Sequence, residues 1–423
     1  MDTRIKELID STKLKFGLDN YYLARQSLKR NVNIFNETTY TLNMEWFPNH
    51  EKQTEDEDSN PEGTAVIDIE LNSLMIESVI FVGGKSFANG IKFNKYDREE
   101  IIKWIEQEAR ITYGKQFEFH KEVEDELYFK ECIDGVAVSP YGFIEIRSDQ
   151  EGRLTLFAIH GQFPAKEMIK GDVFSLTLGD VTPIVKEQLK LIEVPSHEHQ
   201  RFIPVYGIEE IYITNDNQAS TIPFEFIVNA RSYLKVNESL YWDNPLDKPF
   251  DGLKINWTEE VTAAQAISNE RSPDSFPITE QEQEKCIIAV NDFLRREYAD
   301  DSGKWKLKTL HRDKGYIHAT LRAAHQNNHI FQRKITIIID AKRFKVLNYI
   351  DNKPMLAMFE EFEEAEKVTI VKEDAYEKIQ HLLELKPYYV YDFEQKQYVL
   401  CGKLDCQYGV DAANGKVVRL GDL

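Results

Sequence analysis

Hydrophobic and polar positions along the chain recur in one order, in which an amphipathic helix precedes an extended segment and a tight hairpin. Residues 279–350 show it clearly. Thr279 and Glu282 form a capping box, which satisfies the open amides of a first helical turn. Helical spacing then relates Cys286, Ile287, Val290, Phe293 and Leu294. Residues 305–323 read as extended chain, and Ile335, Ile337 and Ile339 alternate before a charged turn. This pattern predicts a helix packed on antiparallel strands.

The same order occurs in residues 97–163. Asp97 and Glu100 mark a helix start, and an apolar stripe follows at Ile101, Ile102, Ile105 and Ala109. A weaker copy covers the N-terminus. There we expect a helical segment from about Arg4 to Arg30, with Gly17 as a candidate break, and strands over residues 39–46, 65–71 and 74–82. The alternation of Ala65, Ile67, Ile69 and Leu71 is typical of a half-buried antiparallel strand.

A second match relates residues 177–195 to residues 369–387 without a gap. It pairs Thr177 with Thr369, Lys186 with Lys378, Gln188 with Gln380, Leu191 with Leu383, and Pro195 with Pro387. We interpret both segments as helices that end at the prolines. Because Pro183 replaces the equivalent of Ala375, the first helix is expected to begin about one turn later than its counterpart. The two halves should then superpose.

These matches predict an α+β fold of tandem modules, each a helix packed on an antiparallel sheet, duplicated in two halves. The expected divisions are an N-terminal α+β unit (1–90), a first repeat pair (91–235), an ordered connector (236–278) and a second repeat pair (279–423). The connector carries Trp242 and Trp257, which a flexible tether would not need. The acidic run from Glu55 to Asp58 is predicted to be a solvated loop.

Charge excludes several classes of partner. The 423 residues carry a net charge of -20, and a surface this negative repels phosphate backbones and anionic membranes. We therefore expect no nucleic-acid partner. No stretch approaches the roughly 20 apolar residues of a membrane span, so no membrane insertion is expected. The charged start of the chain lacks the apolar core of a signal peptide, which favours a cytoplasmic location.

The search for chemistry finds little. The four cysteines are too sparse for a disulfide framework, and no motif of a nucleophile, a zinc protease or a phosphate-binding loop is present. Two histidine sets are candidate metal ligands, His197 with His199, and His318 with His325 and His329. Surface or core positions explain both sets better. We expect no catalytic residues, no cofactor and no metal, so chelators should leave the thermal stability unchanged.

The C-terminal segment carries a family resemblance. Tyr389-Val390-Tyr391, the run from Gln397 to Leu400, and Tyr408-Gly409-Val410-Asp411-Ala412 followed by Asn414-Gly415-Lys416-Val417 resemble the end of a PepSY module. Upstream, Val368-Thr369-Ile370 with Asp374-Ala375 is similar to the helix start of that module. The doubled arrangement resembles the YcdB/YcdC-type repeat proteins of Bacillus-like bacteria. The resemblance implies a binding role for protein or peptide, with peptidase regulation or cell-envelope association among the roles of similar modules.

These observations favour a non-enzymatic protein- or peptide-binding repeat protein. An extended peptide could add to an exposed sheet edge through main-chain hydrogen bonds. Candidate peptide-binding residues are Tyr388, Tyr389, Tyr391 and Tyr398, although ordinary strand packing also explains them. The alternatives are a hydrolase whose site is assembled between repeats, which requires a deep pocket with convergent polar groups, and a structural spacer associated with the envelope.

Overall fold

The structure of the chain is a computed structural model that describes residues 2–423 except 51–58, 95–96, 172, 217–219, 224–232, 326 and 394. The predicted acidic loop at Glu55 to Asp58 lies outside the described residues. The α+β class expected from the sequence is confirmed. The chain forms two compact units, of which the first contains Met1–Lys170, Glu259–Ser275 and Tyr388–Val399. The second contains Gly171–Thr258, Phe276–Pro387 and Leu400–Leu423. The four consecutive segments expected from the sequence stay a prediction.

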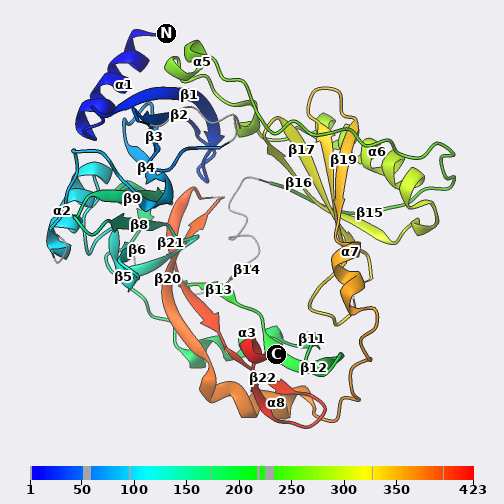
Figure 1. Cartoon of the computed structure of the whole chain (residues 1–423). Coiled ribbons are helices and arrows are strands. Elements are labelled where there is room, and N and C mark those ends of the chain that lie inside the picture. The colour runs from blue at the N-terminus through cyan, green and yellow to red at the C-terminus, as the bar shows by residue number, and fades with distance from the viewer. Residues whose placement is uncertain are drawn as a thin grey trace. The chain divides into compact units, whose positions relative to one another are not determined.

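A helix followed by a four-stranded antiparallel meander occurs three times (Figure 1). The first copy has α1 (Thr3–Lys15), β1 (Tyr21–Val32), β2 (Thr38–Pro48), β3 (Ala65–Glu70) and β4 (Ile76–Phe81). The second has α2 (Arg98–Ala109), β5 (Phe117–Val123), β6 (Glu126–Ile133), β8 (Phe143–Ser148) and β9 (Leu154–His160). The third has α6 (Glu280–Glu297), β16 (Trp305–Asp313), β17 (Tyr316–Ala323), β18 (Lys334–Asp340) and β19 (Val346–Asp351). The element order read from the sequence is therefore present.

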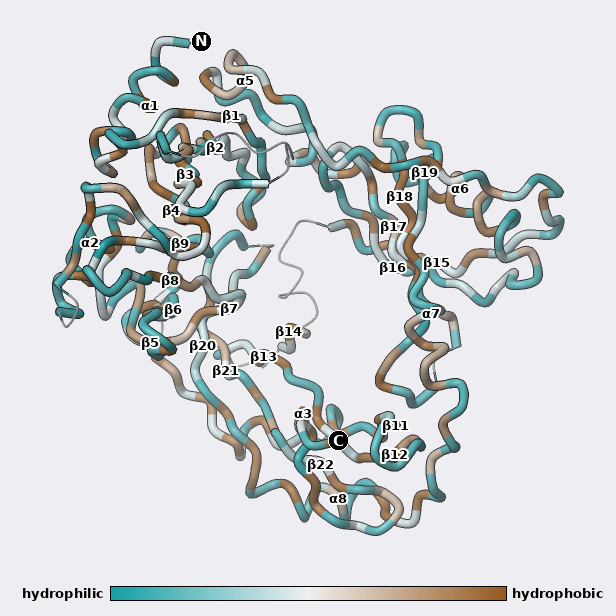
Figure 2. The backbone as a smooth tube through the Cα atoms, viewed as in Figure 1, coloured by the Kyte–Doolittle hydropathy of each residue, from teal (hydrophilic) through white to brown (hydrophobic). Residues whose placement is uncertain are grey.

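The first two meanders join in unit 1, because β4 pairs with β9. The helices of this unit cover a shared core that includes Ile9, Trp46, Ile105, Phe129 and Phe157. The third meander lies in unit 2, where β15 (Leu234–Leu240) adds a fifth strand beside β16. Figure 2 shows hydrophobic and hydrophilic positions mixed along these strands, as expected of sheets with one buried face.

The predicted helix starts at Thr279 and Asp97 are confirmed. Thr279 caps α6 in a complete capping box with Glu282, and the Asp97 carboxylate accepts the amide of Glu100. The predicted N-terminal helix up to Arg30 is wrong, since α1 ends at Lys15 and strand β1 follows. Gly17 has a left-handed φ of 61°, and its Cα lies too close to the backbone of Gly90 for any side chain. The chain must therefore turn there.

The returning hairpin of each meander uses one turn chemistry. An acidic residue lies at the end of the outgoing strand or directly after it, and its carboxylate accepts backbone N–H groups of the turn, at Glu70, Asp149 and Asp340. A residue with positive φ precedes the returning strand, at Leu74, Gly152 and Phe344. Asp411 and Gly415 form the same arrangement near the C-terminus. These turns fix the hairpin registers.

The segments matched at residues 177 and 369 each contain a helix followed by two hairpins. The first copy comprises α3 (Leu178–Gln188), β11 (Leu189–Ser196), β12 (Arg201–Ile208), β13 (Ile211–Thr214) and β14 (Thr221–Pro223). The second comprises α8 (Lys372–Ile379), β20 (Glu384–Asp392), β21 (Gln397–Asp405), β22 (Tyr408–Asp411) and β23 (Val417–Arg419). The order is the same in both copies.

The two copies exchange their second hairpins. Strand β12 pairs with β22, and β13 pairs with β21, so each sheet contains strands of both copies. The registers are equivalent, since Tyr206 opposite Val410 corresponds to Gly402 opposite Ile213. Backbone hydrogen bonds correspond as well, from Ala412 N to Pro204 O at 2.7 Å and from Asn215 N to Leu400 O at 3.1 Å. The copies are therefore related by a local two-fold arrangement and do not form separate modules.

Both helices of these copies pack into one core. Val181 and Val185 of α3 are buried with Ala375 and Ile379 of α8, against apolar strand residues that include Ile211 and Leu404. The expected tandem organisation, in which each module is a helix packed on an antiparallel sheet and is duplicated in two halves, is therefore not confirmed for these two segments. A sequence match could show the duplication but could not show which copy each strand pairs with.

The predicted ends of these helices are also wrong. α3 begins at Leu178 and α8 at Lys372, so α3 begins earlier in the matched segment, not later. A capping box between Thr177 and Asp180 fixes this start, although Pro183 then lies inside the helix. The prolines do not end the helices, because Pro195 lies within β11 and Pro387 within β20.

The sheets are mixed and not wholly antiparallel as expected. β7 (Val136–Ser139) runs parallel to β20, and β10 (Ile169–Lys170) runs parallel to β21. The shorter helices α5 (Ala263–Ile267) and α7 (Lys353–Leu356) lie outside the repeated elements. Within the described part of the chain, no helix is both long and apolar enough to cross a membrane.

Candidate functional site

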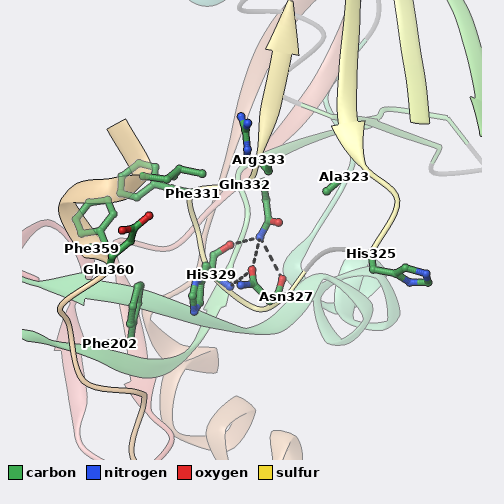
Figure 3. A pocket seen from close by; sticks show the side chains of 11 residues that line it. Phe202, Ala323, His325, Asn327, His329, Phe331, Gln332, Arg333, Phe359 and Glu360 are labelled. Carbon is green, nitrogen blue, oxygen red and sulfur yellow. Dashed lines mark hydrogen bonds between the residues drawn. The ribbon is translucent and has the colours of Figure 1, made fainter. Parts of the chain in front are cut away.

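An aromatic pocket of about 320 Å³ lies in unit 2, where the loop between β17 and β18, the start of β12 and the segment after α7 come together. We call it the aromatic pocket. Its lining comprises Phe202, Ala323, His325, Asn327, His329, Phe331, Gln332, Arg333, Leu356, Phe359 and Glu360 (Figure 3).

Backbone hydrogen bonds position the pocket walls around the β11–β12 hairpin. Glu193 of β11 donates its amide to Asn328 O at 2.7 Å, and its carbonyl accepts the Ile330 amide at 3.0 Å. On the other strand, Phe202 N donates to Glu363 O at 3.0 Å. The pocket therefore rests on sheet-like pairing on both sides of one hairpin.

Four rings form two parallel pairs. The Phe202 and His329 rings stack with centroids 4.1 Å apart, and Phe331 and Phe359 are parallel with centroids 5.7 Å apart. Figure 3 shows the Phe331 and Phe359 rings on one side and His329 on the other, whereas His325 points away. Stacked rings present flat apolar faces, which suit a large apolar or aromatic side chain.

Polar groups hold this arrangement rigid. His329 Nε2 lies 3.2 Å from Glu193 Oε2, and the Gln332 amide bonds the Asn327 carbonyl at 3.1 Å and the His329 carbonyl (Figure 3). The Gln332 contacts join residues of the same loop between β17 and β18 and so restrict its conformation. Asn327, His329 and Gln332 are thereby engaged with protein partners, and the rings of Phe202, Phe331 and Phe359 supply apolar surface for a ligand.

A charged cluster adjoins the pocket at Arg333, which is one of the lining residues. Asp351 accepts hydrogen bonds from Arg333, from the Tyr298 hydroxyl at 2.6 Å and from the Lys353 amide at 2.7 Å. Burial raises the pKa of Asp351, but hydrogen bonds from Arg333 and Tyr298 outweigh it and leave this pKa below its usual value. Burial raises the pKa of Tyr298, and the hydrogen bond that its hydroxyl donates to Asp351 raises this pKa further. The cluster ties the end of the β17–β18 loop to the start of α7.

Exposed apolar side chains are neighbours in the sequence of the residues that line the pocket. Phe331 is 46% exposed, and Ile330, Met355 and Met358 are exposed to a similar degree or more. Exposed apolar patches on soluble proteins commonly mark interaction sites, and flexible methionines adapt to varied partners. The pocket and these exposed side chains together form the candidate site.

The four tyrosines predicted to bind peptide lie elsewhere. Tyr398 is fully buried, Tyr389 and Tyr391 are buried, and Tyr388 is half-buried. The Tyr391 ring packs against Phe35 with centroids 5.0 Å apart and against Tyr398 at 5.2 Å. In unit 1, Tyr391 also borders an open cavity of about 730 Å³ with Phe35 and Lys396. Their packing is that of strand residues in a core, and peptide binding by them stays a prediction.

The two histidine sets do not assemble a metal site. Across the part of the chain that the structure describes, no group of three or more His, Cys, Asp or Glu side chains is placed to hold a metal ion. His199 Nδ1 lies 3.0 Å from the Ser196 hydroxyl, and His318 stacks between Trp257 and His311. Unchanged thermal stability in chelator stays an expected result. A melting-temperature shift of several degrees in EDTA would contradict it.

Sequence reasoning missed the pocket residues. Phe202 lies in β12, Phe331 in the loop between β17 and β18, and Phe359 in the segment after α7, so the three residues are far apart in the sequence. The pocket residues that the sequence singles out are His325 and His329, as candidate metal ligands and not as part of an aromatic pocket. Aromatic residues beside polar loop residues give no distinctive spacing, so only the fold brings them together.

Comparisons with known proteins give one structural neighbour. The Bacillus megaterium YpeB C-terminal domain matches with a TM-score of 0.24 and 8% sequence identity, over 82% of this chain and 96% of that chain. No model of a known protein family matches the chain, and the search among curated proteins found no match. At this TM-score the match carries no argument about the family or the function of this chain.

Proposed function

We propose that this chain is a non-enzymatic binding protein that holds an extended protein segment by inserting a large apolar side chain into the aromatic pocket. The observation that carries the proposal is the pair of parallel Phe331 and Phe359 rings beside a cavity of about 320 Å³. Such a volume accommodates a single side chain such as Leu, Met or Phe. The exposed Ile330, Met355 and Met358 provide apolar surface for the flanking residues of the bound segment.

The composition of the pocket supports binding over catalysis. Its described lining includes no serine, threonine or cysteine that His329 could activate as a nucleophile. His329 is itself stacked on Phe202 and oriented by Glu193. We further propose that the matched helix and hairpin segments are a duplicated pair of PepSY-like modules, which the equivalent registers of β12–β22 and β21–β13 support.

Replacing Phe331 by alanine is expected to abolish peptide binding without unfolding the protein. Phe331 is 46% exposed, so its truncation should cost less than about 1 kcal/mol of stability. A displayed library of random twelve-residue peptides is selected on the wild-type protein, and the affinities of selected peptides are measured by fluorescence anisotropy. We expect enrichment of one large apolar residue and at least a tenfold weaker Kd for the Phe331→Ala variant.

Phe276→Ala is the matched control, because Phe276 is 47% exposed and lies outside the pocket. It should bind the selected peptides within about twofold of wild type. If both variants bind equally well, or if the selection yields no apolar consensus, the proposed site is wrong. Circular dichroism melting curves of both variants report whether the fold is retained.

A further inference from the structure

The lining of the aromatic pocket includes a carboxylate, that of Glu360, which is exposed. Figure 3 shows this carboxylate on the same side of the pocket as the Phe331 and Phe359 rings. Among the described residues, no hydrogen bond or ion pair involves the Glu360 carboxylate. The structure therefore leaves a negative charge near the exposed ring of Phe331.

Other charged groups around the pocket already have partners. Arg333, which also lines the pocket, donates hydrogen bonds from both of its terminal nitrogens to Asp351. In the acidic segment that follows Glu360, the Glu363 carboxylate lies 2.8 Å from the Arg201 guanidinium. A cationic group of a ligand could therefore approach Glu360 without breaking an existing ion pair.

Elsewhere in this chain, an arginine joins a carboxylate to an aromatic ring. The Arg98 guanidinium lies 3.9 Å from the centroid of the Phe119 ring, and its Nη2 lies 3.2 Å from the Glu122 carboxylate. Two further sets show the same arrangement: Arg25 with Phe47 and Glu45, and Arg333 with Trp305 and Asp351. Glu360 and Phe331 supply the carboxylate and the ring, but no arginine of the described chain completes the arrangement there.

A guanidinium group suits a carboxylate beside a ring better than an ammonium group does. Because it is planar, it can donate two parallel hydrogen bonds to a carboxylate while its face lies against an aromatic ring. The ammonium group of lysine is a compact and strongly hydrated charge, so it cannot stack in this way. The cation that best fits the Glu360 side of the pocket is therefore that of arginine.

We propose that the segment bound at the aromatic pocket carries an arginine two residues from its apolar anchor, and that this arginine lies between the Glu360 carboxylate and the Phe331 ring. In an extended chain, residues two positions apart point to the same side and lie roughly 7 Å apart, so both can face the pocket. The net charge of -20 also attracts basic segments. This inference rests on the proposed function and deepens it, because it names the sequence that the pocket selects.

The test is a double-mutant cycle between the peptide and Glu360. A peptide selected on the wild-type protein is labelled with fluorescein and made in three versions, with arginine, lysine or glutamine two positions from its apolar residue. Fluorescence anisotropy gives the Kd of each version for the wild type and for Glu360→Gln. The variant should bind the arginine peptide at least about fivefold more weakly than wild type does, but the glutamine peptide within about twofold. On the wild type, the lysine peptide should bind more weakly than the arginine peptide.

Glu361→Gln is the matched control, because Glu361 is exposed, has no ion pair among the described residues and lies outside the pocket lining. It should bind all three peptides within about twofold of wild type. Equal weakening by both variants would show general attraction to an acidic surface and would overturn the inference.

The selection separates this inference from the proposed function. An apolar consensus without an arginine two positions away would overturn the inference and leave the proposed function standing, whereas the lack of any apolar consensus would overturn both. Equal weakening of the arginine and glutamine peptides by Glu360→Gln would also overturn the inference, because the carboxylate would then not recognise the arginine. Melting temperatures exclude unfolding of the variants as the cause.

Discussion

The Glu131→Gln variant is expected to lack a pH-dependent loss of stability that the wild-type protein shows between about pH 4.5 and pH 7. Glu131 lies on β6, is only 2% exposed, and accepts the amides of Gly142 at 2.6 Å and Phe163 at 3.1 Å. Gly142 and Gly161 leave room for this carboxylate, since a Cβ on Gly142 would lie 2.5 Å from its oxygen.

Burial raises the pKa of Glu131 from 4.5 to about 7, although the two amides act in the opposite direction. The folded state therefore binds the proton more tightly than the unfolded state does. The stability that the protonated Glu131 contributes to the folded state is fully present below pH 4.5 and is lost as the pH rises through about 7. The size of the loss is roughly 3 kcal/mol.

The measurement is hydrogen exchange of the β6 and β8 amides at several pH values, corrected for intrinsic exchange rates. Subtracting the Glu131→Gln profile from that of wild type isolates the contribution of this one carboxyl group. Glu122→Gln on the exposed edge strand β5 is the control and should give a difference that does not change with pH. A wild-type profile parallel to that of Glu131→Gln would contradict the prediction.

The Leu404→Ala variant is expected to unfold the module formed by α3 and α8 more easily by about 2–5 kcal/mol. Leu404 is fully buried in the core that both copies share, and it lies opposite Ile211 in the β13–β21 ladder. Because the hairpins are exchanged, the loss should spread to amides of β11, β12 and β13, which belong to the other copy.

Ile208→Ala provides a companion variant, because Ile208 occupies the corresponding position in the first copy and lies in the same core. Both variants should reduce hydrogen-exchange protection in the same set of strands. Val417→Ala, at an exposed position, should change protection by less than about 0.5 kcal/mol. If Leu404→Ala affected only residues after 371, the exchanged pairing would be wrong.

Local sequence signals predicted the repeated elements well. The capping residues Thr279 and Asp97 mark real helix starts, and alternation located strands such as β3 and β18, because these features depend only on neighbouring residues. Leu189 to Ser196 was assigned to a helix although it is strand β11. Pro195 suggests the end of a helix, but residues 189–196 form a strand because they pair with β12 along their whole length.

Features that depend on distant residues could not be predicted. Opposite partners such as Val205 and Asp411 have no local signature, so the exchange of hairpins was missed. The aromatic pocket was missed for the same reason, since Phe202 and Phe359 meet only in the folded chain. Tyrosine is common in strands because its ring packs well on a half-buried sheet, and Tyr389, Tyr391 and Tyr398 are buried in this way. The residue type alone does not distinguish a tyrosine buried in the core from one that contacts a ligand.

The exchanged hairpins also set the order in which the chain can mature during synthesis. The ribosome completes β13 roughly 190 residues before the partner strand β21 exists, which corresponds to about 10–40 s of translation. During this interval Val181, Val185, Ile211 and Ile213 lack the core that will bury them. The first copy therefore stays unassembled and prone to aggregation until the second copy is synthesised. During the same interval α6 and its meander are synthesised and can fold. Early termination anywhere before β21 would release a product with a permanently open apolar surface.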